Sequence, residues 1–308
     1  MKELWTEKYR PKTIKDYVFK DRNQRAQVEA WITEGSIPHL LFSGSAGIGK
    51  TTLARILCNE LKIEEFDILE INASRENKIE TVRDKITNFV QMIPFGPFKV
   101  VLLDEADYLT PNSQAILRNV METYSNHSRF IITCNYPNRI IPALHSRCQG
   151  FHFERTDITE YTARIATVLV EEDIDFDIDT LDTYVKAAYP DLRKCINNVQ
   201  QNIIGKKLSL PNSVESSNDY RIEMVELFKK RKIRQARTLV CSQALPEEIE
   251  SIYKWMYDNL DLFGDTDDLK DQAIIIIKQG LIDHTICADS EINLAATLIK
   301  LERLQRIE

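Results

Sequence analysis

The 308-residue sequence has few glycines and prolines and no long apolar run. Nine Gly and ten Pro exclude collagen-like and low-complexity chains. The longest aliphatic run, residues 273–277, is far shorter than the roughly 18 residues that a membrane span needs. The first residues, MKELWTEKYRPK, lack the apolar core of a signal peptide. We therefore expect a cytoplasmic protein with no membrane association.

Closely spaced cysteines are also missing. The nearest pair of the six, Cys134 and Cys148, lies 14 residues apart, so there is no C-x-x-C and no zinc or disulfide framework. We expect free thiols in a reducing compartment, and the five scattered histidines favour structural roles over metal binding. Hydrophobic residues make up 43% and charged residues 28%, which together with the length predicts about two globular domains.

The net charge of −7 is unevenly distributed along the chain. Residues 1–155 carry 21 Lys and Arg against 19 Asp and Glu, a net of +2. Residues 156–308 carry 19 against 28, a net of −9. A polyanionic partner should therefore contact the first half of the chain.

Strand and helix signals alternate through the first half. Five short apolar runs are predicted as strands, at residues 39–42, 67–71, 100–103, 130–133 and 151–153. Longer periodic segments between them predict helices at 51–61, 79–92 and 113–124. Because the run at 100–103 is apolar without alternation, we expect that strand to be buried on both faces. This pattern predicts an α/β fold with a parallel five-stranded sheet between helices.

The second half favours helices. Segments 157–172, 179–188 and 191–204 have helical periodicity and acidic residues suited to N-caps. Residues 205–219, GKKLSLPNSVESSND, read as a linker because they are rich in Gly, Ser, Asn and Pro. Four or five helices are expected after it.

A phosphate-binding motif follows the first predicted strand. Residues 44–51, GSAGIGKT, match G-x-x-x-x-G-K-[ST] and open the predicted helix 51–61. Backbone N–H groups of such a loop, together with the helix N-terminus, bind phosphate oxygens. Lys50 would reach the β- and γ-phosphates, and Thr51 would ligate Mg²⁺.

Two adjacent carboxylates follow the buried strand 100–103. Asp104 would hold Mg²⁺ and Glu105 would polarise the attacking water. The combination predicts hydrolysis of a phosphoanhydride, although the phosphate-binding loop alone would also suit a small-molecule kinase.

Four further motifs resemble the clamp-loader branch of the AAA+ ATPases. They are the opening WTEKYRPKT at residues 5–13, LDEAD at 103–107, Gln114 with LRNVME at 117–122, and Ser-Arg-Cys at 146–148. Over residues 1–205 the sequence is similar to replication factor C small subunits and to the ATPase (large) subunit of tailed-bacteriophage clamp loaders. The resemblance implies an AAA+ P-loop ATPase domain at 1–155, a small helical lid at 156–207 and an all-α oligomerisation collar at 220–308.

The resemblance also assigns site residues. Tyr9, Arg10 and Val18 would border the adenine, Asn135 would be sensor 1, and Arg193 would contact phosphate from the lid. Arg147 would be an arginine finger acting on the ATP of a neighbouring subunit. With Lys50, Asp104 and Glu105, the catalytic set includes Asn135 and Arg147. The expected ATP-binding set is Glu7, Tyr9, Arg10, Val18, Ala46, Gly47, Ile48, Gly49, Lys50, Thr51, Thr52 and Arg193.

The implied function is an ATPase subunit that opens a sliding clamp and places it on primer–template DNA. Its partners would be the clamp, the DNA and other subunits of a hetero-oligomeric ring, expected to be a pentamer, in the host cytoplasm if the chain is viral. Gln114 and Arg118 would couple DNA contact to Glu105. The cluster after strand 67–71 would contact the DNA backbone through Arg75, Lys78, Arg83 and Lys85.

Several alternatives stay open at this point. A solvated mixed-charge surface is the alternative for the helix that carries Arg83, because Glu76, Glu80 and Asp84 are interleaved. A branch-migration helicase motor and a non-hydrolysing scaffold subunit are the competing functions.

Two charged runs are given no function. The acidic run 171–182 lacks the glycine of a calcium loop. The basic run 229–237 is interpreted as a solvated helix junction.

Overall fold

The computed structural model describes residues 3–76, 79–153, 156–210, 220–245 and 248–305. The chain divides into two compact units. The first comprises residues 1–168 and 190–197, and the second comprises residues 169–189 and 198–308. Within the described ranges, no helix is both long and apolar enough to cross a membrane.

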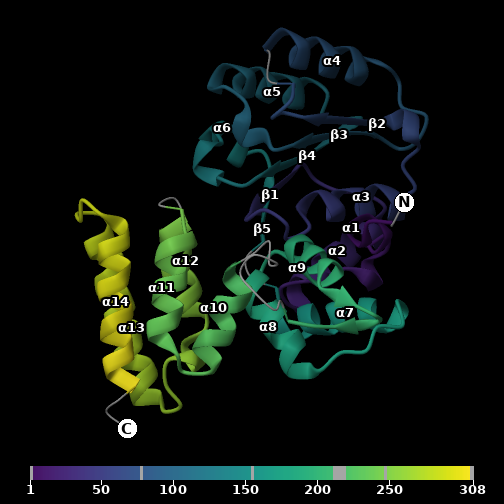
Figure 1. Cartoon of the computed structure of the whole chain (residues 1–308). Coiled ribbons are helices and arrows are strands. Elements are labelled where there is room, and N and C mark those ends of the chain that lie inside the picture. The colour runs from purple at the N-terminus through teal and green to yellow at the C-terminus, as the bar shows by residue number, and fades with distance from the viewer. Residues whose placement is uncertain (1–2, 77–78, 154–155, 211–219, 246–247, 306–308) are drawn as a thin grey trace. The chain divides into compact units, whose positions relative to one another are not determined.

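The first unit contains the predicted five-stranded parallel sheet, in the order β2-β3-β4-β1-β5 (Figure 1). Its strands are β1 (Leu40–Gly44), β2 (Ile68–Asn72), β3 (Lys99–Asp104), β4 (Ser128–Cys134) and β5 (Gln149–Phe153). The α/β fold class predicted from the sequence is confirmed. In β3, Val100 and Leu102 face one core while Val101 and Leu103 face the other, so this strand is buried on both faces, as expected.

Helices cover both faces of the sheet (Figure 1). The longer helices of the unit are α2 (Arg22–Glu34), α3 (Lys50–Glu60), α4 (Ile79–Gln91) and α5 (Pro111–Thr123). Helices α2 and α3 contribute to one core, and α4 and α5 contribute to the other. Short helical segments complete the unit: α1 (Trp5–Lys8), η1 (Ile14–Asp16), η2 (Glu65–Asp67), η3 (Ala106–Tyr108), η4 (Pro137–Arg139) and α6 (Pro142–His145).

The expected acidic N-caps of the next helices are present. Asp157 precedes α7 (Ile158–Glu171), Asp177 precedes α8 (Ile178–Ala188), and Asp191 precedes α9 (Leu192–Gln201). Each carboxylate accepts a hydrogen bond from a backbone N–H in the first turn of its helix. For α8 the cap is Asp177, two residues before the predicted helix start.

The predicted end of the third helix is wrong. The helix stops at Gln201, and β6 (Ile203–Ile204) pairs antiparallel with β7 (Lys207–Leu208). The turn between them has positive φ at both Gly205 and Lys206, which a type I′ hairpin requires. The start of the predicted linker is therefore a tight hairpin, and residues 211–219 lie outside the described residues.

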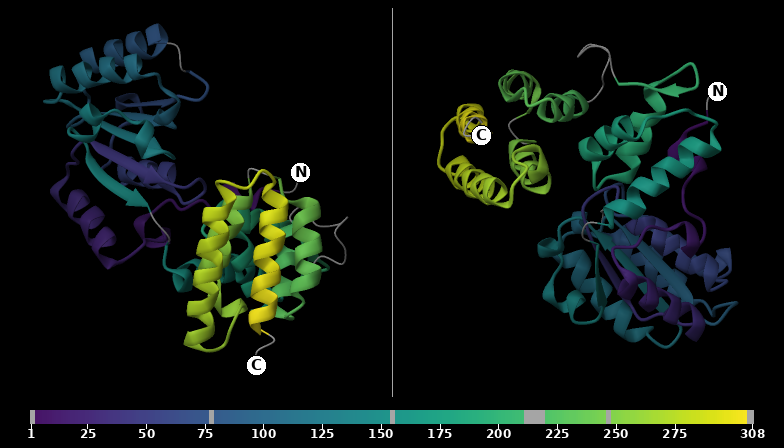
Figure 2. Two further views of the ribbon diagram at one scale, coloured as in Figure 1. Left: turned by 90° about the vertical axis from the view of Figure 1, so that its left-hand side faces the viewer. Right: turned by 90° about the horizontal axis from the view of Figure 1, so that it is seen from below.

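Five helices follow in the described part of the second unit (Figure 2). They are α10 (Tyr220–Lys229), α11 (Ile233–Gln243), α12 (Ile249–Asp258), α13 (Asp267–His284) and α14 (Ser290–Gln305), with η6 (Leu260–Leu262) before α13. Helix α8 packs against α10 within this unit. Lys229 on α10 lies 2.8 Å from Asp182 on α8, and Lys186 on α8 lies 2.7 Å from Asp261.

A buried ion pair in the first unit fixes the segment between α4 and β3. Lys99 donates to Asp67 at 2.8 Å, and the two side chains are 2% and 0% exposed. Asp67 also accepts the N–H groups of Phe95 and Gly96 at 2.8 Å each. Burial acts to raise the pKa of Asp67, but the hydrogen bonds from Lys99 and the two amides outweigh it and lower that pKa.

Candidate nucleotide site

The phosphate-binding loop connects β1 to α3. Gly47 and Gly49 have φ of +74° and +93°, a region that residues with a Cβ rarely adopt. A Cβ on Gly47 would also lie 1.9 Å from the Oδ1 atom of Asp191, which caps α9. Glycine is therefore required at position 47 both by the backbone conformation and by the close approach of this carboxylate.

Lys50 is buried beneath the loop, and its ammonium group donates three hydrogen bonds. Its Nζ donates to the carbonyl oxygens of Gly44 at 2.8 Å and Ser45 at 2.6 Å, and to Oδ1 of Asn135 at 2.9 Å. Burial lowers the pKa of Lys50 to about 8, against the raising effect of nearby groups that include Asp104. The three acceptors hold the ammonium at the inner side of the loop, where phosphate oxygens would be contacted.

The acid pair lies at the carboxyl end of β3. Oδ1 of Asp104 accepts hydrogen bonds from Oγ1 of Thr51 at 2.7 Å and Oγ1 of Thr133 at 2.6 Å. Glu105 has φ +57°, and its N–H donates to the Thr133 hydroxyl at 3.0 Å. A carboxylate beside a hydroxyl is an oxygen donor set that suits Mg²⁺, so these residues fit the predicted metal site.

The predicted ATP-binding residues, together with the predicted catalytic residues Asp104, Glu105 and Asn135, line two neighbouring pockets of the first unit, with volumes of about 690 Å³ and 510 Å³. In the first are Glu7, Tyr9, Arg10, Val18, Gly47, Ile48, Gly49, Thr52 and Arg193. In the second are Ala46, Gly47, Gly49, Lys50, Thr51, Thr52, Asp104, Glu105, Asn135 and Arg193. Arg193, near the start of α9, lines both pockets, so this helix contributes a side chain to each of them.

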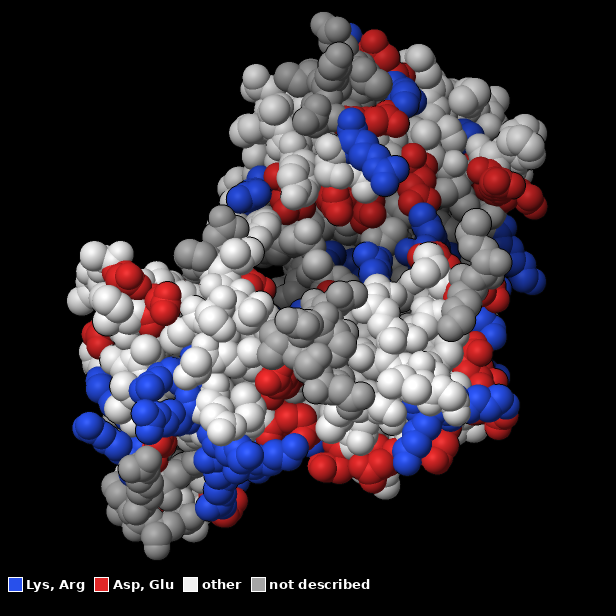
Figure 3. Space-filling view, viewed as in Figure 1, with Lys and Arg blue, Asp and Glu red and all other residues white. Residues whose placement is uncertain are grey.

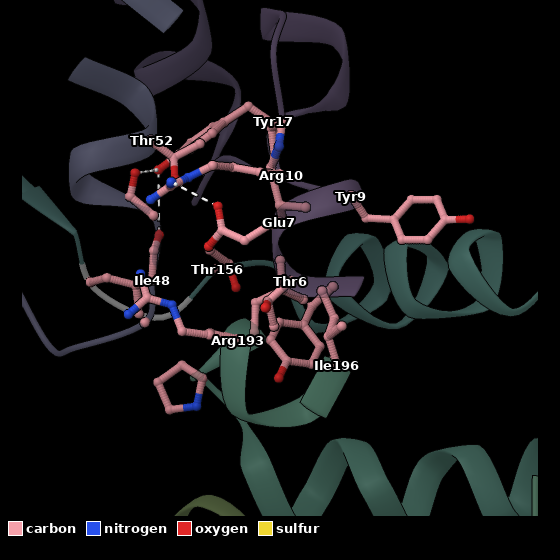
Figure 4. Close-up of a pocket in the computed structure, with 17 residues that line it drawn as sticks. Thr6, Glu7, Tyr9, Arg10, Tyr17, Ile48, Thr52, Thr156, Arg193 and Ile196 are labelled. Carbon is pink, nitrogen blue, oxygen red and sulfur yellow. Dashed lines mark hydrogen bonds and ion pairs between the residues drawn. The ribbon is translucent and has the colours of Figure 1, made fainter. Parts of the chain in front are cut away.

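Figure 4 shows how the labelled side chains of the larger pocket lie. The guanidinium groups of Arg10 and Arg193 point toward the side formed by Ile48 and Thr52, whereas the ring of Tyr9 points away from them. Arg10 also forms an ion pair with Glu7 at 3.2 Å. The pocket therefore presents two cations beside the phosphate-binding loop.

Sequence reasoning missed several lining residues. Tyr17 is buried, and its hydroxyl donates to the carbonyl oxygens of Ile48 at 3.4 Å and Gly49 at 3.3 Å. Its ring atoms come within 3.0 Å of the position that a Cβ on Gly49 would take. No local pattern marks Tyr17, because only the folded chain brings residue 17 against the loop. Others that were missed are Thr6, Pro11, Thr133, Thr156, Tyr161, Pro190, Leu192 and Ile196.

Arg147 is not among the residues that line either pocket. Its Nε donates to Glu122 at 2.7 Å, and its Nη1 donates to the carbonyl oxygen of Ala143 at 2.8 Å. The side chain is 32% exposed. Within its own chain, Arg147 is therefore held by an ion pair near the surface, outside both pockets.

The two predicted coupling residues differ in their surroundings. Gln114 is fully buried; its amide donates to the carbonyl oxygens of Leu109 and Arg139, and its Oε1 accepts from the N–H of Ile141. It thus ties α5 to the segment before α6. Arg118 is half-buried and hydrogen-bonds its neighbour Asn119.

The predicted DNA-contacting residues include two that are ion-paired. Arg83 lies 2.9 Å from Asp84, and Lys85 pairs with Glu76. Arg75 is exposed at the end of β2. Lys78 lies outside the described residues. On the face that Figure 3 shows, Lys and Arg are interspersed with Asp and Glu over α4 and α5.

An exposed apolar patch beside α4 was also missed. Phe66, Met92, Ile93 and Phe95 are 80%, 56%, 87% and 81% exposed. The rings of Phe66 and Phe95 lie 6.3 Å apart. The buried Asp67, which follows Phe66 in the chain, accepts a hydrogen bond from the Phe95 N–H. This bond joins the backbone next to Phe66 to the backbone of Phe95. We call these four residues the α4 apolar patch.

The sheet, the loop and the acid pair together define a P-loop nucleoside triphosphatase. Comparison with known families agrees: residues 40–155 match the ATPase family associated with various cellular activities (AAA). Solved structures of similar fold include the RuvB Holliday junction branch migration motor of Thermotoga maritima, with a TM-score of 0.56 and 17% identity over 80% of each chain. At that identity the likeness concerns the fold.

Curated relatives carry the comparison further. The replication factor C small subunit of Methanococcus vannielii is 31% identical over 99% of this chain and 100% of its own length. That of Sulfurisphaera tokodaii is 35% identical over 97% and 94%. The match to that of Haloarcula marismortui is 42% identical but spans 64% of this chain and 62% of the relative. The chain belongs to the replication factor C small-subunit family of AAA+ ATPases.

Proposed function

We propose that this chain is an ATP-hydrolysing subunit of a sliding-clamp loader, in which ATP binding opens the clamp and grips primer–template DNA, and hydrolysis releases the closed clamp. The observation that carries the proposal is the convergence of Lys50, Thr51, Asp104, Glu105 and Asn135 around one pocket in a chain of this family. A scaffold subunit without turnover has no need to retain all five.

In this proposal each group has a separate task. Lys50 supplies a positive charge at the β- and γ-phosphates. Thr51 and Asp104 would hold Mg²⁺, which neutralises charge on the phosphate oxygens. Glu105 orients and polarises the attacking water, and Asn135, already bonded to Lys50, reports on the γ-phosphate.

Arg147 is proposed to act on the ATP of a neighbouring subunit. Its position outside the pocket of its own chain supports a role between subunits. Its ion pair with Glu122 would have to open for the guanidinium to reach a phosphate. Once that ion pair opens, the planar guanidinium fork matches a phosphate group in a bidentate contact.

Assembly into a ring, for which we propose a pentamer, would use the second unit as a collar. On α13, in the turn after it and at the start of α14, four isoleucines are exposed: Ile275, Ile282, Ile286 and Ile292. Apolar surface of this kind is typical of an interface that is buried in the assembly. The division into an ATPase domain, a lid and a collar belongs to the same proposal.

Contacts with the clamp and DNA are proposed for the first unit. The α4 apolar patch offers exposed aromatic and aliphatic anchors, which suit a protein partner such as the clamp. Arg75, Lys78, Arg83 and Lys85 would contact the DNA backbone. Gln114 and Arg118 would connect that contact to Glu105, because Gln114 donates to the carbonyl oxygen of Leu109 in the segment that follows Glu105.

The test is ATP turnover by the assembled complex, with and without clamp and primed DNA. Two single variants are mixed, Glu105→Gln and Arg147→Ala. If each shared site needs Glu105 from one subunit and Arg147 from its neighbour, some interfaces in the mixture keep both groups, and activity partly recovers. Failure of the isolated Arg147→Ala chain to bind ATP would show instead that this arginine acts within its own subunit.

A further inference from the structure

The basic run at residues 229–237 holds six Lys and Arg in the acidic half of the chain. The structure separates them into two groups. Three form ion pairs within the second unit: Lys229 with Asp182, Lys230 with Glu226, and Arg231 with Asp265. The other three, Lys232, Arg234 and Arg237, have no hydrogen-bond or ion-pair partner for their side chains among the described residues. The run is therefore not uniformly neutralised.

Two further cations lie beside this second group. Helix α11 packs against α14. The two helices are antiparallel, because Cys241 and Ala244 at the end of α11 line one pocket with Ser290 and Leu294 at the start of α14. The first turns of α11 therefore lie beside the last turns of α14, which carry the exposed Lys300 and Arg303.

We define the α11–α14 basic face as Lys232, Arg234, Arg237, Lys300 and Arg303. Figure 3 shows Lys and Arg gathered over the lower halves of these two helices, whereas Asp and Glu gather at the opposite end of α14. Helix α11 contains no acidic residue, and the last two turns of α14 contain one, Glu302. The local charge is strongly positive although the second half of the chain has a net charge of −9.

The face also lacks apolar anchors. Among the described residues, no large hydrophobic side chain is exposed on α11, and the one on α14, Ile292, is at the opposite end of that helix. Protein interfaces usually centre on buried aromatic or aliphatic anchors. Contact with a phosphodiester backbone needs cations and hydrogen-bond donors only, and the arginine fork matches a phosphate.

We propose that the α11–α14 basic face binds the phosphodiester backbone of a nucleic acid without reading its sequence. This site lies in the second unit, whereas the DNA contacts of the proposed function lie around α4 in the first. It requires no nucleotide and no hydrolysis. It therefore goes beyond the proposed function and is tested independently of it.

The test measures binding of the full chain, without nucleotide, to fluorescent single-stranded and duplex oligonucleotides at several salt concentrations. The variant is Arg234→Gln with Arg237→Gln. Its matched control is Lys254→Gln with Lys278→Gln, two exposed lysines on α12 and α13. For duplex DNA, each lost phosphate contact should lower the slope of log affinity against log salt by about 0.9, so the variant should lose up to about 1.8.

The expected loss is equal for two unrelated DNA sequences, and the control variant keeps the parent slope. An unchanged slope in the arginine variant overturns the proposal. An equal loss of slope in the control variant also overturns it. So does binding of an acidic polypeptide at this face when no DNA binding is detected there. Light scattering is measured in parallel, because a changed oligomeric state would assign this face to contacts between copies of the chain. If the parent chain shows no ATP turnover, the proposed function is contradicted, whereas the DNA-binding measurement on this face still stands.

Discussion

The affinity of the free chain for ATP should fall as the pH rises through 8, because Lys50 loses its proton there. Burial penalises the ammonium and lowers the pKa of Lys50 to about 8, while Cys134, Asp104, Asp107 and Glu105 oppose the shift. Bound phosphates stabilise the charged form, so ATP binds the protonated chain. Above pH 8, ATP binding requires Lys50 to take up a proton, and the free-energy cost of that uptake increases with pH.

The magnitude follows from the pKa. With a pKa of about 8 in the free chain, the apparent Kd is multiplied by about 1.1 at pH 7 and about 11 at pH 9, a change of roughly tenfold or 1.4 kcal/mol. ATP itself is already about nine-tenths ionised at pH 7, because a phosphate's last pKa is near 6, so its own charge changes little across this range. The loss therefore reports on the protein.

Isothermal titration calorimetry without Mg²⁺, which prevents turnover, measures both quantities. At pH 8 about half a proton should be taken up per ATP, visible as a dependence of the heat on the ionisation enthalpy of the buffer. Lys50→Arg is the control, since arginine stays charged over the whole range and its affinity, whatever its value, should not change with pH. A flat Kd between pH 7 and 9 in the parent chain would refute the reasoning.

Three further outcomes are expected. Glu105→Gln should bind ATP with near-parental affinity and lose turnover by at least about a hundredfold, measured by nucleotide binding and phosphate release; equal loss of affinity would argue against its separate role. Gly47→Ala should weaken ATP binding through both backbone strain and collision with Asp191, and combining it with Asp191→Ala should recover the collision part only; strictly additive losses would exclude the contact. Lys99→Met should destabilise the first unit by about 3–5 kcal/mol in urea unfolding, because Asp67 is left buried without its cation; a loss below 1 kcal/mol would contradict the assigned burial.

Much of the first unit could be predicted locally. Apolar runs of three to five residues bounded by polar segments marked the strands. The glycine-rich loop was recognisable because its residue types are dictated by backbone geometry. The predicted end of the helix 191–204 was wrong because the β-branched pair Ile203 and Ile204 continues a helical pattern in the sequence. Its partner strand, Lys207 and Leu208, pairs with it only in the folded chain.

Site residues remote from the loop needed the family resemblance or the structure. The resemblance indicated Asn135 and Arg193, and the structure places both at the pocket of Lys50. Neither the residue patterns nor the resemblance indicated Tyr17 or the contact between Asp191 and Gly47, which the structure alone shows. These depend on packing between segments more than 30 residues apart in the chain.

What the sequence alone determined is the chemistry near the loop and the alternation of strands and helices, because both follow from residues that are neighbours in the chain. Tertiary structure alone decided which charges are neutralised. Lys85 and Lys229 are paired with carboxylates, whereas Arg234 and Arg303 come together from segments almost 70 residues apart on neighbouring helices. Charge pairing depends on distance in space, which a linear pattern of basic residues does not contain.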